Sequence, residues 1–371
     1  MARPSSGYLA EFGFRVPYDP AVSERDMEQA AELWADYEQR AADERRRHDL
    51  QRLNAIRRWR AQIRELVGAE NYHDLRQLKR RLHKEAYVNR KPPDGLGLRS
   101  EDLTRLNAER LHSFLAERGL LREAIHDRLS RRFDDLTVAR PTHWDGTVHL
   151  AGHADVLGKS SAANPWTTFT PPFSGWQGGV GYGAVTSGFR TANTPLLNPA
   201  AGQVGSILTL DCDDASDFDV AAITADRQVA FWYQAPVTGL IEVVIRAVCG
   251  EARHTLNVED EWGVSSFEVD QKSFLMMHVI HPNVREPQFQ LVSELSASGD
   301  TSTYRTEQHI VPGQSVESRV LVSDGPVAAG EWVVIRAGSR SSDGARTNDM
   351  EIHSRTAFSW FLTRIHVHVR Q

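Results

Sequence analysis

The sequence predicts an α+β multi-domain protein in which a long N-terminal helical hairpin or coiled coil precedes an antiparallel, jelly-roll-like β-sandwich region. The apolar residues are spaced three and four apart up to about residue 137 and alternate after it, which are the periods of helices and strands. The first 140 residues carry 28 Lys/Arg against 24 Asp/Glu, whereas residues 141–371 carry 15 against 25. We therefore divide the chain into an N-terminal arm (1–21), a helical stalk or bundle (22–137) and a β-sandwich region (138–371).

The first helix is predicted from Ser23 to about Val67, a stretch without Pro or Gly. Ser23, with Asp26 three residues later, supplies an N-cap, and Gly68 ends the helix. Its apolar positions form one narrow seam with coiled-coil spacing, which we expect to pair with another helix or a second copy of the chain: Met27, Ala30, Trp34, Tyr37 and Ala41.

Charges along this helix are sorted. Residues 24–44 contain eight acids and two Arg, and residues 45–64 contain eight Arg and one acid. The distribution complements the helix dipole and suits antiparallel pairing of two copies, so we expect a homo-oligomer. Clustered Arg could also contact phosphates, but the net charge of −6 does not favour a nucleic-acid partner. Two further helices are predicted at about 71–89 and 100–133, separated by a Pro/Gly-rich run at 91–97.

The β region is predicted from short alternating runs separated by Gly, Pro, Asn, Asp and Ser turns. The expected strands are 147–157, 204–210, 229–234, 239–249, 262–269, 273–281, 288–295, 316–323, 331–337 and 356–369. Regions 236–281 and 326–368 echo each other: Val243–Ala247 resembles Val333–Ala337, and each follows a Pro-Val pair. An internal duplication and chance convergence both explain this echo.

Residues 158–205 contain nine Gly and five Pro with no clear period, which predicts a long loop. Its aromatic residues could stack on sugars or contact a neighbouring subunit, or they could fold inward as a satellite core. We select three of them as candidate ligand-binding residues, which must stay accessible if they form a platform: Trp166, Trp176 and Tyr182.

Two clusters could hold a metal. Carboxylates in a loop are suitable ligands for Ca²⁺, which makes calcium the candidate cofactor for Asp211, Asp213, Asp217 and Asp219; a solvated acidic turn is the alternative, since the EF-hand spacing is absent. Imidazoles and carboxylates bind zinc or iron, which draws attention to Asp349, Glu351, His353, His366 and His368. No HExxH motif occurs, so surface or interface histidines are the alternative there.

Composition narrows the class of protein. The chain is 40% hydrophobic and 25% charged, and its longest apolar stretches are far shorter than the roughly 20 residues that span a bilayer. No signal peptide is recognisable, so we expect a cytoplasmic location or export by another route. With only Cys212 and Cys249, a Cys-rich zinc site or disulfide scaffold is excluded.

These observations favour a non-enzymatic structural or adhesive protein, because no signature of a catalytic nucleophile is present. Such a protein would oligomerise through its helical region and present a β-sandwich head, as an assembly subunit or for binding a glycan or protein receptor. Two alternatives remain: a carbohydrate-active or metal-dependent enzyme on a jelly-roll scaffold, and a pore-forming or membrane-acting toxin.

Overall fold

The computed structural model describes residues 14–15, 19, 21–75, 77–78, 81, 109–110, 112–120, 164–173, 175–183, 185, 188–212, 218–260, 266–300, 304–348 and 350–371. Its elements are β1 (Phe14–Arg15), α1 (Glu24–Val67), β2 (Thr167–Phe169), β3 (Gly175–Tyr182), β4 (Phe189–Pro195), the 3₁₀ turn η1 (Pro199–Ala201), β5 (Gln203–Cys212), β6 (Phe218–Gln234), β7 (Gly239–Asp260), β8 (Ser266–Ile280), β9 (Gln288–Asp300), β10 (Tyr304–Ile310), β11 (Ser315–Glu317), β12 (Leu321–Val327), β13 (Trp332–Asn348) and β14 (Met350–Arg370).

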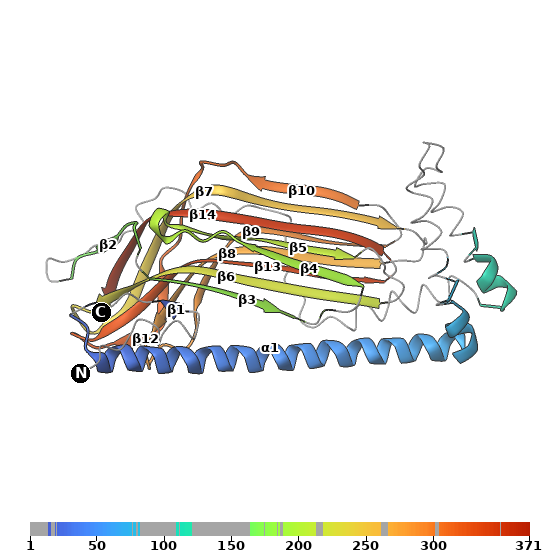
Figure 1. The fold of residues 1–371 in the computed structure, drawn as a ribbon, viewed down its shortest axis with the longest axis horizontal. Coiled ribbons are helices and arrows are strands. Elements are labelled where there is room, and N and C mark those ends of the chain that lie inside the picture. Colours follow the sequence, from blue (N-terminus) through green and yellow to red (C-terminus); the bar gives the residue numbers. More distant parts are fainter. Residues whose placement is uncertain are drawn as a thin grey trace.

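The strands form two antiparallel sheets in a β-sandwich-like arrangement (Figure 1). Sheet A has the order β1-β3-β6-β13-β8-β9, and sheet B has the order β10-β7-β14-β5-β4. β11 and β12 also pair with β7, and β2 pairs with β14. The antiparallel sandwich that the alternating pattern predicts is therefore present.

Two apolar clusters fill the space between the sheets. Cluster I includes Val229, Ile245, Leu275, Ile335 and Phe358. Cluster II includes Leu210, Ile223, Leu256, Phe267 and Ile352. Burial of these side chains is the main favourable contribution to folding, at about 25 cal/mol per Å² of apolar surface.

A layer of buried polar residues separates the two clusters, and we call it the polar layer. Each of the strands β5, β6, β7, β8, β9, β13 and β14 contributes at least one member between its cluster I and cluster II residues. The members are Ser206, Arg227, His254, Gln271, Ser273, Ser293, Ser339, Ser341, Asp343, Ser354 and Thr356. Asp343 is at its centre, where Ser354 Oγ donates to its carboxyl group at 2.7 Å and Gln271 Nε2 lies 3.4 Å away.

Helix α1 begins and ends close to the predicted residues. Ser23 is its N-cap and accepts a hydrogen bond from the Asp26 amide, and Gly68 follows its last residue with φ of +83°. Asn71 Nδ2 donates to the Val67 carbonyl at 2.8 Å, which satisfies one of the free carbonyl groups at the helix end.

The predicted helical hairpin or coiled-coil stalk is wrong, because the molecule is mostly β and α1 packs on a sheet. Its seam residues Ala30 and Trp34, together with Val22, form one apolar cluster with the outer face of sheet A: Ala230, Trp232, Ile280 and Val334. Met27 and Tyr37 pack against the same cluster. The seam therefore finds its partner within the chain, and the α1 ribbon runs alongside the strands (Figure 1).

The other predicted helices are described only in part. Residues 69–75, 77–78, 81, 109–110 and 112–117 are helical, and Leu75 and Leu78 pack against the buried Leu115. The predicted strand 147–157 lies outside the described residues. The division into an arm, a helical part and a β region remains a prediction.

The prediction of a long loop at 158–205 is wrong for its described part, which contains β2, β3, η1 and β4. β3 pairs with β6 from Gly175↔Ala230 to Tyr182↔Ile223, and β4 pairs with β5. Backbone pairing in a sheet does not need side-chain alternation, so a Gly-rich segment can form a strand when a neighbour supplies its hydrogen bonds.

The two halves of the sequence echo occupy both sheets. Val243–Ala247 lies on β7 in sheet B and Val333–Ala337 lies on β13 in sheet A. The same two regions also share a Phe-Leu pair, and its placement is reversed: Phe274 lies on β8 in sheet A and Phe361 lies on β14 in sheet B. Thus β7 pairs with β14, and β8 pairs with β13, in the two sheets. The duplication itself remains a prediction.

Two absences apply to the part of the chain that the structure describes. No helix there has both the length and the apolar composition required to cross a membrane. Cys212 and Cys249 are both buried, and no disulfide joins the described residues.

Candidate functional site

An aromatic strip on β3 is the first candidate site. Side chains alternate along a strand, so Trp176, Val180 and Tyr182 share one face of β3. Tyr182 is 52% exposed and Val180 is 37% exposed, although this face points to the same side as the buried Ile223 and Val229 of β6. The last strand of sheet B, β4, approaches β6, and β3 lies one strand further out in sheet A. The strip is thus left partly open to solvent.

Arg227 supports the strip from the interior. The missing side chain of Gly178 leaves room for it, since a Cβ there would lie 3.4 Å from Arg227 Cδ. Arg227 Nη1 donates to the Gly179 carbonyl at 2.7 Å, and Nη2 lies 3.4 Å from Oδ1 of Asn193 on β4. Burial lowers the pKa of Arg227, and the nearby Asp226 and Tyr182 act in the opposite direction. The guanidinium therefore joins β3 to sheet B beneath the strip.

Trp166 lies elsewhere. Its ring stacks on His368 of β14 with the centroids 4.8 Å apart, and the adjacent β2 pairs with β14 in sheet B. Both Trp166 and Trp176 are half-buried, so none of the three predicted aromatic residues is deeply buried. The structure brings Trp176 and Tyr182 together on one strand and places Trp166 on the other sheet.

The predicted calcium loop is described at its two ends only. Asp211 lies on β5, where its Oδ1 is 3.2 Å from Nδ1 of His353. Asp219 is buried on β6, close to Gly188, whose Cβ would lie 2.6 Å from Asp219 Oδ2. Asp213 and Asp217 lie outside the described residues, and the calcium site remains a prediction.

The second predicted metal cluster is spread along the outer face of sheet B. A β-bulge between Leu362 and Arg364 shifts the alternation of β14, so His353, His366 and His368 all lie on this face. His366 Nδ1 lies 2.9 Å from Thr168 Oγ1, and His368 Nδ1 lies 3.4 Å from Glu242 Oε2.

His353 has a protonated imidazole at neutral pH. Hydrogen bonds to Asp211 and Glu351 raise its pKa to about 10. A metal ligand requires the neutral ring, so this pairing competes with metal binding. Asp349 lies outside the described residues, among which no group of three or more His, Cys, Asp or Glu side chains is placed to hold a metal ion.

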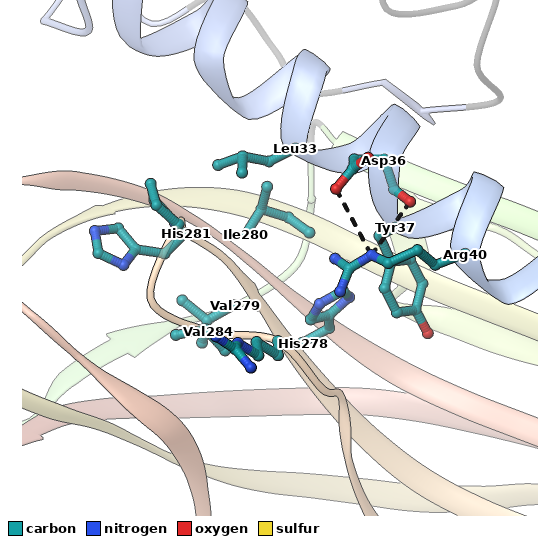
Figure 2. Close-up of a pocket in the computed structure, with 11 residues that line it drawn as sticks. Leu33, Asp36, Tyr37, Arg40, His278, Val279, Ile280, His281 and Val284 are labelled. Atoms are coloured by element: carbon teal, nitrogen blue, oxygen red, sulfur yellow. Dashed lines mark hydrogen bonds and ion pairs between the residues drawn. The ribbon is translucent and has the colours of Figure 1, made fainter.

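A cavity of about 310 Å³ between α1 and sheet A is the second candidate site (Figure 2). One wall comes from α1 and the other from the end of β8 and the turn that follows it. The lining residues are Leu33, Asp36, Tyr37, Arg40, His278, Val279, Ile280, His281, Pro282, Val284 and Arg285.

The polar groups of the cavity have defined hydrogen-bonding states. Arg336 Nη2 donates to His278 Nδ1 at 2.5 Å, so the imidazole hydrogen is on Nε2. Burial and then the charges of Arg336, Arg340 and Arg40 hold the pKa of His278 well below 6.5, which keeps the ring neutral. Burial raises the pKa of Tyr37, which keeps its phenol neutral.

This cavity could not be identified from the sequence. Tyr37 was assigned to a coiled-coil seam, and Arg40 lay in a charged stretch that is ordinary for an exposed helix face. The His278–Arg285 segment meets these residues only because α1 lies on sheet A. Arg40 is one of two Arg residues in the acidic stretch 24–44, and this pattern carries no information about the neighbours of its side chain.

Comparisons with known proteins add little. No known protein family matches this sequence, and no curated protein matches it significantly. One solved structure, TmCBM61 in complex with beta-1,4-galactotriose, is similar at a TM-score of 0.10 and 11% identity, over 48% of this chain and 88% of that chain. The enzymatically active domain of tailspike protein 4 of bacteriophage CBA120 is similar at a TM-score of 0.12 and 10% identity, over 45% of this chain and 19% of that chain. Similarities of this size carry no argument about function.

Proposed function

We propose that this protein is a non-enzymatic binding protein whose β sandwich binds a glycan along the aromatic strip of β3. The observation that carries the proposal is the pair Trp176 and Tyr182 on one face of one strand, with both Tyr182 and the intervening Val180 exposed. A contiguous exposed apolar patch with a polar rim is typical of a binding site on a folded protein.

The chemistry of the strip suits a sugar. An aromatic ring offers a flat apolar surface to the CH face of a pyranose, and its edge leaves hydroxyl groups free for hydrogen bonds. Trp176 and Tyr182 are six residues apart, which corresponds to about 20 Å at about 3.3 Å per residue. This length favours an oligosaccharide over a single sugar. Between the two rings, only Gly178 and Val180 lie on this face: Val180 adds a small apolar side chain, and the Arg227 side chain lies over Gly178.

The proposal is tested by titrating the full chain against a panel of neutral oligosaccharides, with calorimetry and tryptophan fluorescence as readouts. We expect Tyr182→Ala to weaken binding tenfold or more, which equals about 1.4 kcal/mol, because the substitution removes a stacking surface. Since Tyr182 is exposed, the melting temperature of the variant should stay close to that of the wild type.

Trp166→Ala is the matched control. It removes a half-buried tryptophan from the other sheet and should bind the panel as the wild type does. Equal losses in the Tyr182 and Trp166 variants would contradict a site confined to β3. A panel in which no oligosaccharide binds would contradict glycan binding altogether.

A further inference from the structure

We propose that the cavity between α1 and β8 is a second binding site, and that it binds a small organic acid through its carboxylate. The site is separate from the β3 strip, since β6 and β13 lie between β3 and β8 in sheet A.

Arg40 supplies the first donor. Its described contacts both use Nε, which lies 3.4 Å from the Asp36 carbonyl oxygen and 3.6 Å from Asp36 Oδ2. Figure 2 shows the end of this guanidinium beside His278. Asp36 thus fixes the side chain, while the pair of nitrogens best suited to bidentate carboxylate binding points to the cavity.

His278 supplies the second donor. Because its Nδ1 accepts from Arg336, its Nε2 carries a hydrogen and can only donate. Arg336 is 1% exposed and its guanidinium lies 3.6 Å from the centroid of the Trp34 ring, so a full positive charge lies directly behind the imidazole. This charge polarises the Nε2–H group toward an anion while keeping the ring itself neutral.

The balance of charge also favours an anion. Arg40 and Arg285 line the cavity with Asp36 as the single acid, and Arg336 stands behind the wall. The next cation, Arg340, is already paired with Asp226 through hydrogen bonds of 2.5 and 2.7 Å. His281 is also committed, since its Nε2 faces Glu331 at 3.0 Å and its Nδ1 accepts from the Asn283 amide.

The rest of the lining is apolar, so a matching ligand carries an apolar group as well as a charged group. Leu33, Ile280 and Val284 enclose one side, and the Tyr37 ring stands on the other with its centroid 4.5 Å from that of His278. A volume of about 310 Å³ is at the lower end of the range for small-molecule sites. A carboxylate attached to a compact ring or short chain matches both the positively charged donors and the apolar walls. Inorganic phosphate matches only the donors.

The test is a calorimetric titration of the full chain with benzoate, hexanoate and glucuronate, each beside its neutral amide, and with inorganic phosphate. We expect at least one acid to bind at least tenfold more tightly than its amide and more tightly than phosphate. Arg40→Gln and Arg285→Gln should each weaken that acid tenfold or more without changing the melting temperature, because both side chains are exposed.

Arg46→Gln is the matched control, since Arg46 is exposed on the same helix and outside the cavity. It should bind the acid as the wild type does. Failure of all three acids to bind at millimolar concentration would overturn the proposal. Equal binding of acid and amide, equal binding of phosphate, or equal losses in the Arg40 and Arg46 variants would each overturn it as well.

Discussion

Trp34→Ala is expected to lower the free energy of unfolding by about 3–5 kcal/mol, the usual cost of truncating a buried tryptophan. Trp34 is 1% exposed and lies at the centre of the contact between α1 and sheet A. The substitution also removes the ring that covers the Arg336 guanidinium and so leaves a buried charge without its aromatic neighbour. Urea unfolding followed by circular dichroism measures the loss.

Leu50→Ala is the control for this experiment, since Leu50 lies on the same helix and is 55% exposed. It should change stability by about 0.5 kcal/mol or less. Similar losses in the two variants would mean that the first half of α1 gains no stability from sheet A. That result would contradict the packing that replaces the predicted coiled coil.

Asp343→Asn is expected to stabilise the protein by about 4 kcal/mol above pH 8 and to lose this advantage as the pH falls toward 4. Burial raises the pKa of Asp343 to about 7, although Ser354, Gln271 and Thr356 donate hydrogen bonds to it. The folded state therefore holds a proton that the unfolded state releases near pH 4. Stability from this group is present below pH 4 and is lost as the pH rises through 7, by about 1.36 kcal/mol per pKa unit. Asparagine is neutral throughout and avoids this loss.

The measurement is the difference in unfolding free energy between variant and wild type from pH 4 to 9. The neighbouring His254 has a pKa lowered to about 4 by burial, so its contribution is lost as the pH falls from about 6.5 through 4. Both proteins retain His254, and the difference isolates Asp343. Asp43→Asn, an exposed change on α1, should show a small difference without pH dependence. A flat difference for Asp343→Asn would show that the carboxyl group is ionised in the folded protein.

Local signals were sufficient for the limits of α1, because Ser23 and Gly68 act within one turn of the helix ends. Local signals were not sufficient to identify the surface against which α1 packs. A narrow stripe of Ala30, Trp34 and Tyr37 fits the groove of another helix and the face of a sheet equally well. Only the apolar outer positions of β6, β8 and β13 decide between them, and these lie more than 190 residues away.

Strands were predicted where apolar residues alternate and were cut short where they do not. The prediction for β13 stopped at residue 337, since Ser339, Ser341 and Asp343 follow on the buried face. Polar residues at interior positions resemble a loop in sequence, and their partners come from other strands. β3 was missed for a different reason, because its glycines give no alternation of side chains. β4 was missed because Phe189 is its only large apolar residue.

In the candidate sites, too, single residues could be selected from the sequence, but their neighbours from other elements could not. Trp176 and Tyr182 could be selected from the sequence because they are aromatic residues in a Gly-rich segment without a clear period, but their separation from Trp166 required the sheet order. The cavity required the placement of α1, which the seam alone had assigned to another helix. Asp211 and His353 were each noted, in different proposed sites, and their pairing across β5 and β14 came from strand register.

The polar layer has a consequence for how the two sheets find their alignment. Antiparallel strands rich in Val, Ile and Ala can slide by two residues and keep the same side chains facing inward. Here such a slip would move Asp343 away from Ser354 and set it among aliphatic side chains, at a cost of about 1–3 kcal/mol for each buried polar group that loses its partner. Each interior strand contributes its polar-layer residues between its cluster I and cluster II residues. A slip of any of these strands therefore carries a similar penalty. The polar layer thus selects one register among several that would bury equal apolar area, at the expense of stability that an all-aliphatic interior would provide.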